Sequence, residues 1–239
     1  MVRYGSEMTS LEGSSILVLG ASGGLGSEIA RLLAAGGARL ILSGRDPAKL
    51  EALAIPGAAV AADLTDPDAI TALVAEAVSL NGRLDGIVNA SGVVAFGPAV
   101  EVSDETLTEL FALNTLAPIR LLRAARAALA ESAEQGRAPF VVTLSGVVSE
   151  SPTANLAAYS ASKAALAAFG QAAGRELRRS GIRILDARPG HTETDLSTHP
   201  ISGTAPRLPT GYSPAAVAQR VVDAIVNGER DLASTSFHP

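Results

Sequence analysis

The sequence predicts a single doubly wound α/β domain, in which a parallel sheet carries helices on both faces. Two observations predict this class. Short apolar runs alternate with longer amphipathic stretches along the chain, and the apolar runs are nearly continuous, which is typical of strands buried on both faces. The 239 residues are enough for one such core, and neither a linker nor an internal repeat is visible. We expect one domain over residues 13–239, preceded by a flexible segment over residues 1–12.

Strands and helices are expected to alternate in chain order. Pro47, Pro67 and Pro214 stand at first-turn positions that helices tolerate, and Ser103 is a candidate N-cap with Thr106 three residues on. The predicted strands cover residues 15–19, 39–43, 58–62, 84–89, 140–144 and 182–187, with an edge strand over 230–233. The predicted helices cover residues 24–36, 47–55, 66–80, from 103 onward, 154–179 and 213–227, and the Ser-, Thr-, Pro- and Gly-rich stretch 191–212 is a surface loop.

Composition excludes several functional classes. The net charge is −5 and no Lys/Arg block occurs, so we expect no nucleic-acid partner. No apolar run approaches the ~20 residues of a membrane span, and no signal peptide is visible, so we expect a cytoplasmic protein without a membrane partner. There are no cysteines and only three scattered histidines, which predicts no metal site.

A glycine-rich loop stands between the predicted strand 15–19 and the helix 24–36. Ligands of an open parallel sheet bind beyond the carboxyl ends of its strands, so functional residues should follow strands directly. Glycines at this point let the backbone approach a pyrophosphate, to which the start of the helix offers N–H groups. An ordinary strand-to-helix turn is the alternative, but the position favours a dinucleotide site. Its expected contacts are Gly20, Ser22, Gly23, Gly24, Leu25 and Gly26.

The residues after the second predicted strand bear on the choice of cofactor. An NAD site would have Asp or Glu about 20 residues beyond the glycines to bind the ribose hydroxyls. Gly44 stands there instead, and Arg45 follows it with a guanidinium that suits a 2′-phosphate. In the alternative, Arg45 is a solvated charge and Asp46 binds the ribose. We expect Ser43 and Arg45 to favour NADP(H) over NAD(H).

Tyr159 and Lys163 are four residues apart and so share one face of the predicted helix 154–179. The chain has only three tyrosines and two lysines, which makes this pairing informative. A neighbouring ammonium lowers the pKa of a phenol from about 10, which would make Tyr159 a general acid and base near neutral pH. A solvated surface pair is the alternative.

Together these features resemble the short-chain dehydrogenase/reductase family over about residues 14–230. The resemblance implies a Rossmann-type sheet, an oxidoreductase acting on a carbonyl or alcohol, and a homodimer or homotetramer. It rests on Gly20, Gly24, Gly26, Asp63-Leu64, Asn89-Ala90-Ser91-Gly92, Asn114, Tyr159, Lys163 and Pro189-Gly190.

The resemblance also implies a role for each matching residue. Tyr159 would exchange a proton with the substrate oxygen. Lys163 would hold the nicotinamide ribose and tune Tyr159, and Asn114 would hold a water that relays protons toward Lys163. Read singly, Asp63 could be a helix cap, Asn114 a solvated helix residue and Pro189-Gly190 a turn. The further cofactor contacts that the resemblance implies are Asp63, Leu64, Asn89, Ala90, Ser91, Gly92, Pro189, Gly190 and Thr192, with Thr194 as a weaker candidate.

The sequence departs from the family pattern at the catalytic serine. Where the family usually carries that serine, this chain has Gly146, and Ser145 stands one place earlier. A shift of one residue in a strand turns the side chain to the opposite face, so Ser145 can serve only if the strand end bulges. Ser149 is a weaker candidate for the same role.

We therefore expect an NADP(H)-dependent oxidoreductase that moves a hydride between the nicotinamide and a small carbonyl or alcohol substrate, as in ketoreductases. Its catalytic residues would be Tyr159, Lys163, Asn114 and Ser145. The alternative is a non-catalytic NADP(H)-binding or sensing protein, because Gly146 replaces the serine. Epimerisation or dehydration of a nucleotide-sugar is a third possibility, but the chain has no long carboxyl-terminal substrate region.

Overall fold

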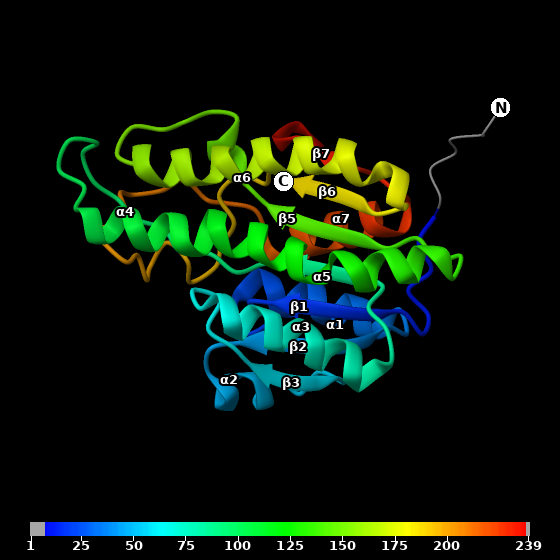
Figure 1. Ribbon diagram of the computed structural model, residues 1–239. Coiled ribbons are helices and arrows are strands. Elements are labelled where there is room, and N and C mark those ends of the chain that lie inside the picture. Colours follow the sequence, from blue (N-terminus) through cyan, green and yellow to red (C-terminus); the bar gives the residue numbers. More distant parts are fainter. Residues whose placement is uncertain (1–7, 238–239) are drawn as a thin grey trace.

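Seven parallel strands form one sheet in the order β3–β2–β1–β4–β5–β6–β7, which the computed structural model describes over residues 8–237 (Figure 1). All neighbouring strands pair in parallel, so their carboxyl ends meet at one edge of the sheet. The strands are β1 (Ser15–Leu19), β2 (Arg39–Gly44), β3 (Ala58–Ala61), β4 (Gly86–Asn89), β5 (Phe140–Leu144), β6 (Arg183–Ala187) and β7 (Asp231–Leu232).

Helices cover both faces of the sheet, as the sequence predicts. In Figure 1, α3, α5 and α6 lie in front of the sheet, and α1 and α7 lie behind it. The α-helices are α1 (Gly24–Ala35), α2 (Pro47–Glu51), α3 (Pro67–Asn81), α4 (Asp104–Phe111), α5 (Ala117–Glu134), α6 (Ala157–Glu176) and α7 (Pro214–Val226). Short helical turns are η1 (Ala112–Leu116), η2 (Val147–Ser149), η3 (Leu177–Ser180) and η4 (Ser234–Ser236).

The central strand shows why the apolar runs are continuous. Ile16 and Val18 pack into the core on the α1 and α7 side, whereas Leu17 and Leu19 pack into the core on the α3 and α5 side. All four side chains are fully buried. Because both faces of β1 are covered, no position along it can be polar without a partner.

Two predicted helices are shorter than the sequence indicates. The helix predicted over 47–55 ends at Glu51, and Ala54 lies just beyond it with a φ of +51°. The helix predicted over 154–179 begins at Ala157, because Asn155 has a φ of +62°. Both values lie in the left-handed region, which a right-handed helix cannot contain.

The helix predicted from residue 103 begins as expected but is interrupted. The hydroxyl of Ser103 accepts a hydrogen bond from the N–H of Thr106 at 3.1 Å, and this caps α4. A π-helical turn, η1, then separates α4 from α5, and the N–H of Ala117 donates to the carbonyl of Ala112 five residues earlier. Pro118, at the start of α5, has no N–H to give to the carbonyl of Asn114, so a regular α-helical ladder is already broken here.

The first described residues lie where the strands begin, at the edge of the sheet opposite to the one where their carboxyl ends meet. Of the predicted flexible segment 1–12, residues 1–7 lie outside the described residues. Thr9 is buried, and its N–H donates to the carbonyl of Val226 at the end of α7. Among the described residues, no helix is both long and apolar enough to cross a membrane.

Candidate active site

The glycine loop between β1 and α1 lies against the loop that follows β4. Gly20 has a φ of +67°, and a Cβ atom there would stand 2.7 Å from the backbone nitrogen of Ser91. A Cβ on Gly26 would collide with the carbonyl oxygen of Gly20. Both positions therefore require glycine. The N-cap of α1, Gly23, offers no side-chain oxygen, so the first N–H groups of α1 are left for an anion such as a pyrophosphate.

The ends of β2 and β3 lie beside this loop. Ser43 is buried, and its hydroxyl has no hydrogen-bond partner among the described residues. Arg45 is exposed directly after β2. Asp46 is engaged as the N-cap of α2, where its carboxylate accepts from the N–H of Ala48 at 3.0 Å. A hydroxyl and a guanidinium without partners among the described residues fit the adenosine end of a dinucleotide at this edge, whereas one oxygen of the Asp46 carboxylate is already committed to capping α2.

Asp63 and Leu64 follow β3, and the first is bonded within its own turn whereas the second is buried. The carboxylate of Asp63 accepts from the N–H and the hydroxyl of Thr65 at 2.9 and 2.8 Å. These two hydrogen bonds, with a smaller contribution from the charge of Arg45, hold the pKa of Asp63 below its usual value. Leu64 is buried in the core on the α3 side. The bonds to Thr65 hold the turn that precedes α3, whereas the helix cap that was the alternative for Asp63 is supplied by Asp66. One carboxylate oxygen of Asp63 stays available.

The segment from Asn89 to Gly92 continues from β4 toward the middle of the sheet edge. The side-chain oxygen of Asn89 accepts from the N–H and the hydroxyl of Ser91, at 3.2 and 2.5 Å. The N–H of Ala90 donates to the carbonyl of Leu19, which fixes this segment to β1. A Cβ on Gly92 would lie 3.1 Å from the amide oxygen of Asn114 and 3.3 Å from Nζ of Lys163. The absence of a side chain at Gly92 thus leaves room where these two polar groups converge.

Tyr159 and Lys163 lie on the first turns of α6, on the side facing the sheet edge. Nζ of Lys163 donates to the carbonyl of Leu144 at 2.8 Å and lies 5.8 Å from the centre of the Tyr159 ring. Burial lowers the pKa of Lys163 to about 8, while the negative charge of Asp186 acts in the opposite direction. Burial raises the pKa of Tyr159 to about 12. The direction for Tyr159 is opposite to the one the sequence predicts, because burial of the phenol disfavours its charged form.

Asn114 is placed by the π-helical turn η1. It is buried, accepts from the N–H of Val93 at 3.0 Å, and donates to the carbonyl of Val93 and the hydroxyl of Ser162 at 2.9 and 3.1 Å. It does not face water, which removes the reading of a solvated helix residue. Its amide is instead fixed beside Gly92 and Lys163.

The turn after β5 places the Ser145 side chain inside the protein and not in an open site. Ser145 is fully buried, and its hydroxyl donates to the Asp186 carboxylate at 2.7 Å. Ser149 donates to the carbonyl of Gly146 at 2.7 Å and lies 3.1 Å from the Ser145 hydroxyl. Gly146 has a φ of +73°, and a Cβ there would meet only the carbonyl of Pro189, at 3.8 Å. The structure thus brings Ser145 to Asp186 and leaves open space where a side chain at Gly146 would stand.

Loop 191–212 closes back over the glycine loop and the end of β6. The ring of Tyr212 lies on Gly190, where a Cβ would be 2.8 Å from the ring, and Thr194 lies equally close to Gly24. Thr192 donates to the carbonyl of Gly190 at 3.1 Å. Beside Gly190 is a shallow hollow of about 450 Å³, lined by Val147, Gly190, Tyr212, Ser234, Thr235 and Phe237.

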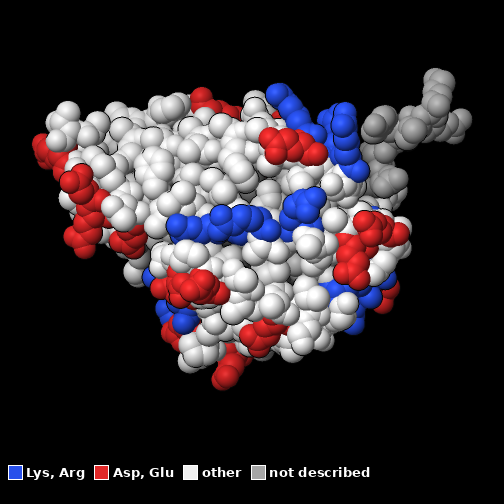
Figure 2. Space-filling view, in the orientation of Figure 1, with Lys and Arg blue, Asp and Glu red and all other residues white. Residues whose placement is uncertain are grey.

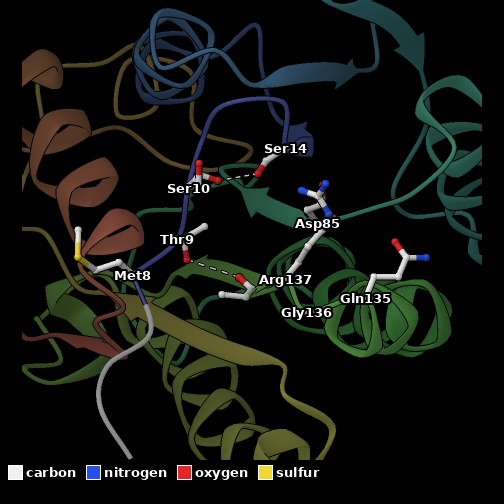
Figure 3. Close-up of a pocket in the computed structure, with 9 residues that line it drawn as sticks. Met8, Thr9, Ser10, Ser14, Asp85, Gln135, Gly136 and Arg137 are labelled. Carbon is white, nitrogen blue, oxygen red and sulfur yellow. Dashed lines mark hydrogen bonds and ion pairs between the residues drawn. The ribbon is translucent and has the colours of Figure 1, made fainter.

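A larger hollow, of about 620 Å³, lies at the opposite edge of the sheet and carries none of the predicted residues (Figure 3). Its carboxylate, Asp85, is already bonded by the N–H of Ser15, the hydroxyl of Ser132 and the guanidinium of Arg83. Arg137, which points toward Asp85, is 3.7 Å from it. These groups bind one another where β1 and β4 begin, so we assign this hollow a structural role.

The predicted residues therefore gather at the carboxyl edge of the sheet, with the exceptions of Leu64, which is in the core, and Ser145, which is covered. Sequence reasoning missed Asp186 and Arg188, which are buried and ion-paired at 3.0 Å. The signal was present, because three charged residues, Arg183, Asp186 and Arg188, stand in or next to the predicted strand 182–187, and buried charges need partners.

Comparison with known proteins gives matches over most of the chain. A profile described as short chain dehydrogenase matches residues 14–202. Dehydrogenase/reductase SDR family member 7B of Mus musculus is 30% identical over 247 residues, which covers 96% of this chain and 75% of that protein.

Solved structures match along the whole fold. A 3-ketoacyl-(acyl-carrier-protein) reductase from Brucella melitensis, complexed with NADH, has a TM-score of 0.84 and 25% identity, covering 95% of this chain and 99% of that chain. A metagenomic short-chain oxidoreductase in complex with NADP has a TM-score of 0.77 and 30% identity, covering 94% and 98%. One of these two similar proteins holds NADH and the other holds NADP, which carries an additional 2′-phosphate.

Proposed function

Because the chain belongs to the short-chain dehydrogenase/reductase family, we propose that it is an NADP(H)-dependent oxidoreductase acting on a small carbonyl or alcohol. The observation that carries this proposal is the position of Tyr159 and Lys163. They start α6 at the same sheet edge at which the glycine loop leaves the N–H groups of α1 free. The chemistry that NADP(H) supplies when bound is the exchange of a hydride with the substrate carbon.

Tyr159 would act as the proton donor to a substrate oxygen. Its pKa of about 12 keeps the phenol protonated at neutral pH, which is the form that a carbonyl reduction needs. The Tyr159 hydroxyl has no hydrogen-bond partner among the described residues, so it is free to donate.

Lys163 and Asn114 would support this proton transfer through a bound water. The ammonium of Lys163 and the amide oxygen of Asn114 converge beside Gly92, where a water could receive hydrogen bonds from one and donate to the other. Lys163 would hold the ribose of the cofactor with the donors that its carbonyl partner, Leu144, leaves free.

Substrate oxygen binding would rest mainly on Tyr159. The Ser145 hydroxyl would have to leave the Asp186 carboxylate to reach a substrate, and a charged acceptor holds a hydroxyl about twice as strongly as a neutral one. Ser149 is nearer to the open space at Gly146, but it donates to a backbone carbonyl. We infer that the reaction proceeds with one side-chain donor fewer than in relatives that carry the serine.

The preference for NADP(H) is supported by what Asp46 and Arg45 do. The carboxylate that would bind the ribose hydroxyls of NAD caps α2 instead. Arg45 is exposed beside the buried Ser43 hydroxyl, which is without a partner in the described structure. A guanidinium and a hydroxyl are donors suited to the 2′-phosphate.

Self-association is proposed on the outer face of α6. Its small side chains are exposed or half-buried rather than packed on the sheet, and the surface over α6 in Figure 2 is largely uncharged beside a basic row over α5. The residues of this face are Ala157, Ala161, Ala164, Ala168 and Ala172. Small residues allow close helix–helix contact, and light scattering of the purified protein gives the mass that tests it.

The test of the proposed function compares the wild type with Tyr159→Phe against a panel of aldehydes and ketones. NADPH consumption should fall by about 10²–10⁴-fold in kcat, and the NADPH dissociation constant should stay unchanged. Retention of full turnover in Tyr159→Phe would refute the assignment. Tight NADPH binding by the wild type without turnover on any carbonyl would favour the sensing alternative, for which Gly146 is the supporting residue.

A further inference from the structure

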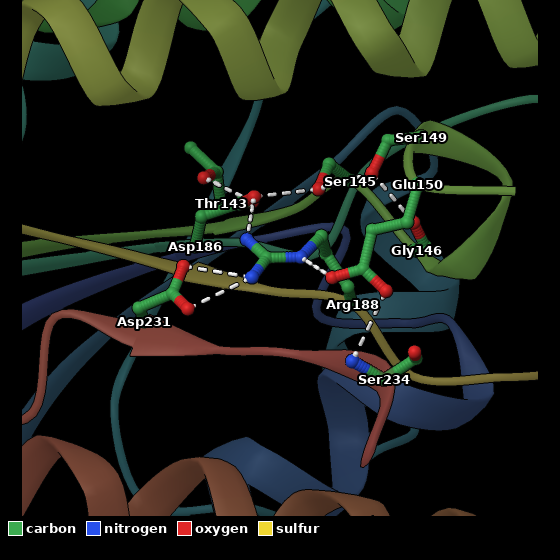
Figure 4. Close-up of polar contacts among 9 residues, drawn as sticks. All are labelled: Thr143, Ser145, Gly146, Ser149, Glu150, Asp186, Arg188, Asp231 and Ser234. Atoms are coloured by element: carbon green, nitrogen blue, oxygen red, sulfur yellow. Dashed lines mark hydrogen bonds and ion pairs between the residues drawn. The ribbon is translucent and has the colours of Figure 1, made fainter. Parts of the chain in front are cut away.

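Arg188 stands at the centre of a polar cluster behind the candidate site, made of Arg188, Asp186, Glu150 and Asp231 (Figure 4). The Arg188 guanidinium donates to Asp186 at 3.0 Å, to Glu150, and to both oxygens of Asp231 at 2.8 and 2.9 Å. Arg188 and Asp186 are buried, whereas most of the Asp231 side chain is exposed. One cation is thus shared by three carboxylates, of which only Asp186 lies deep in the structure.

Asp186 lies on the face of the sheet that α6 covers. Side chains alternate along a strand, and Ile184, two residues before Asp186, packs on Gly170 and Gly174 of α6. Thr143, which pairs with Asp186 in the sheet register, donates to its carboxylate at 3.0 Å and lies 3.9 Å from a Cβ built on Gly170. Lys163 comes from this same helix, so the carboxylate and the ammonium share one buried layer.

A short chain of bonds connects the two groups. The carboxylate of Asp186 accepts from the hydroxyl of Ser145, and the next residue toward the amino terminus, Leu144, gives its carbonyl to Lys163. From Asp186 to Lys163 the path consists of two hydrogen bonds, of 2.7 and 2.8 Å, and the end of β5 between them. This explains why Ser145 is turned away from the substrate side.

Asp186 is also the carboxylate that acts on Lys163. The other groups near the ammonium are neutral: the phenol of Tyr159 from α6, the amide of Asn114 from η1, and the carbonyl of Leu144 from β5. Burial lowers the pKa of Lys163, and the charge of Asp186 is what opposes this change. Arg188 donates to the same carboxylate oxygen as Ser145 and offsets the cost of burying the carboxylate.

We propose that Asp186 is a positioning residue for the Tyr159–Lys163 pair, which keeps Lys163 in its ammonium form and fixes, through Ser145, the carbonyl to which Lys163 is bonded. The electrostatic part stands on its own, and only its consequence for turnover rests on the proposed function. Arg188 supports this role because its guanidinium donates to the Asp186 carboxylate and so stabilises the buried charge.

The lysine content of the chain permits a direct test. Lys49 and Lys163 are the only lysines, and Lys49 is exposed on α2, so protein labelled with ¹³C at the lysine ε-carbon gives two signals, one of which is an internal reference. The variants are Asp186→Asn and, as the matched control, Asp231→Asn, which removes a carboxylate from the same guanidinium but at the surface. Asp186→Asn should lower the pKa of Lys163 by about 1 or more, and Asp231→Asn by less than about 0.3.

Two results would overturn the proposal: an unchanged Lys163 titration in Asp186→Asn, or an equal change in Asp231→Asn. Should Asp186→Asn fail to fold, the pair Asp186→Asn with Arg188→Gln removes anion and cation together. The same direction is expected, because the charge that acts on Lys163 is that of the Asp186 carboxylate, which is also the acceptor for Ser145. This measurement needs neither cofactor nor substrate, so its result can be interpreted even if the proposed function is wrong.

Turnover supplies the second readout. If Lys163 acts as an ammonium ion, the alkaline limb of kcat/KM should move to lower pH in Asp186→Asn by the same amount as the lysine titration, and stay in place in Asp231→Asn. A merely structural role would reduce the rate at every pH without moving the limb, and that outcome would contradict the proposal.

Discussion

Replacing Arg188 with methionine should destabilise the protein far more than a surface ion pair would suggest. The variant removes the guanidinium but keeps an apolar stem of similar length. Asp186, whose side chain is 6% exposed, would then keep only the hydroxyl donors of Thr143 and Ser145. Loss of one partner from a buried pair leaves an uncompensated charge in the interior.

The magnitude follows from which carboxylates are buried. Breaking a buried pair costs about 3–5 kcal/mol, and the share from Asp231, whose side chain is 61% exposed, is small by comparison. For a chain of this length, each kcal/mol moves Tm by roughly 2–4 °C, so a decrease of roughly 6–20 °C is expected. The double variant Asp186→Asn/Arg188→Met should recover most of the loss, because no buried charge remains.

Urea unfolding followed by circular dichroism would give the free energies of the wild type, both single variants and the double variant. Asp231→Asn is the control and should cost less than about 1 kcal/mol. The reasoning fails if Arg188→Met costs less than about 1 kcal/mol, or if the double variant is no more stable than Arg188→Met alone.

Three further outcomes are expected. Arg45→Ala should weaken NADPH binding by about 10–100-fold, which corresponds to the loss of one or two charge-assisted hydrogen bonds, and should leave NADH binding nearly unchanged. Both affinities can be measured by fluorescence titration. Equal losses for both cofactors would show that Arg45 does not bind the 2′-phosphate. Asp85 has a pKa below the usual value of 3.8, because burial, which raises it, is outweighed by the hydrogen bonds from Ser15 and from its other partners. The ionised Asp85 carboxylate therefore stabilises the fold fully above pH 3.8, and this contribution is lost as the pH falls through the lower pKa of the folded protein. Asp85→Asn should flatten the acid limb of the curve of unfolding free energy against pH, measured by urea unfolding. Gly146→Ala should lower the free energy of unfolding by roughly 1–2 kcal/mol, because a φ of +73° is unfavourable for alanine although the nearest atom is 3.8 Å away; a neutral result would mean that the turn relaxes.

Much of the fold could be predicted from local patterns. The continuous apolar runs predict strands buried on both faces, and the core on both sides of β1 confirms it. Gly20 needs its positive φ and lies against Ser91, a contact that the position of a glycine directly after a strand already suggests. Such features depend on residues near one another in sequence, or on a pattern repeated along the chain.

The remaining features depend on contacts between distant segments. The direction of the pKa shift of Tyr159 could not be predicted from Lys163 alone, because it depends on how deeply the folded chain buries the phenol. The environment of Ser145 depends on Asp186, 41 residues later. The π-helical turn that positions Asn114 left a trace in the sequence, Pro118, but a proline in a first turn is also compatible with an ordinary helix start.

The parallel direction of all seven strands has a practical consequence for handling the protein. Thr9 and the hollow around Asp85 lie where the strands begin, whereas Phe237 lines the hollow beside Gly190, where they end. A purification tag or surface linker that joins the described chain at Met8 would therefore enter at the far side of the sheet and leave the site facing solution. The same tag at the carboxyl terminus would be attached next to Gly190, so assays and immobilised preparations are better built from the amino-terminal fusion.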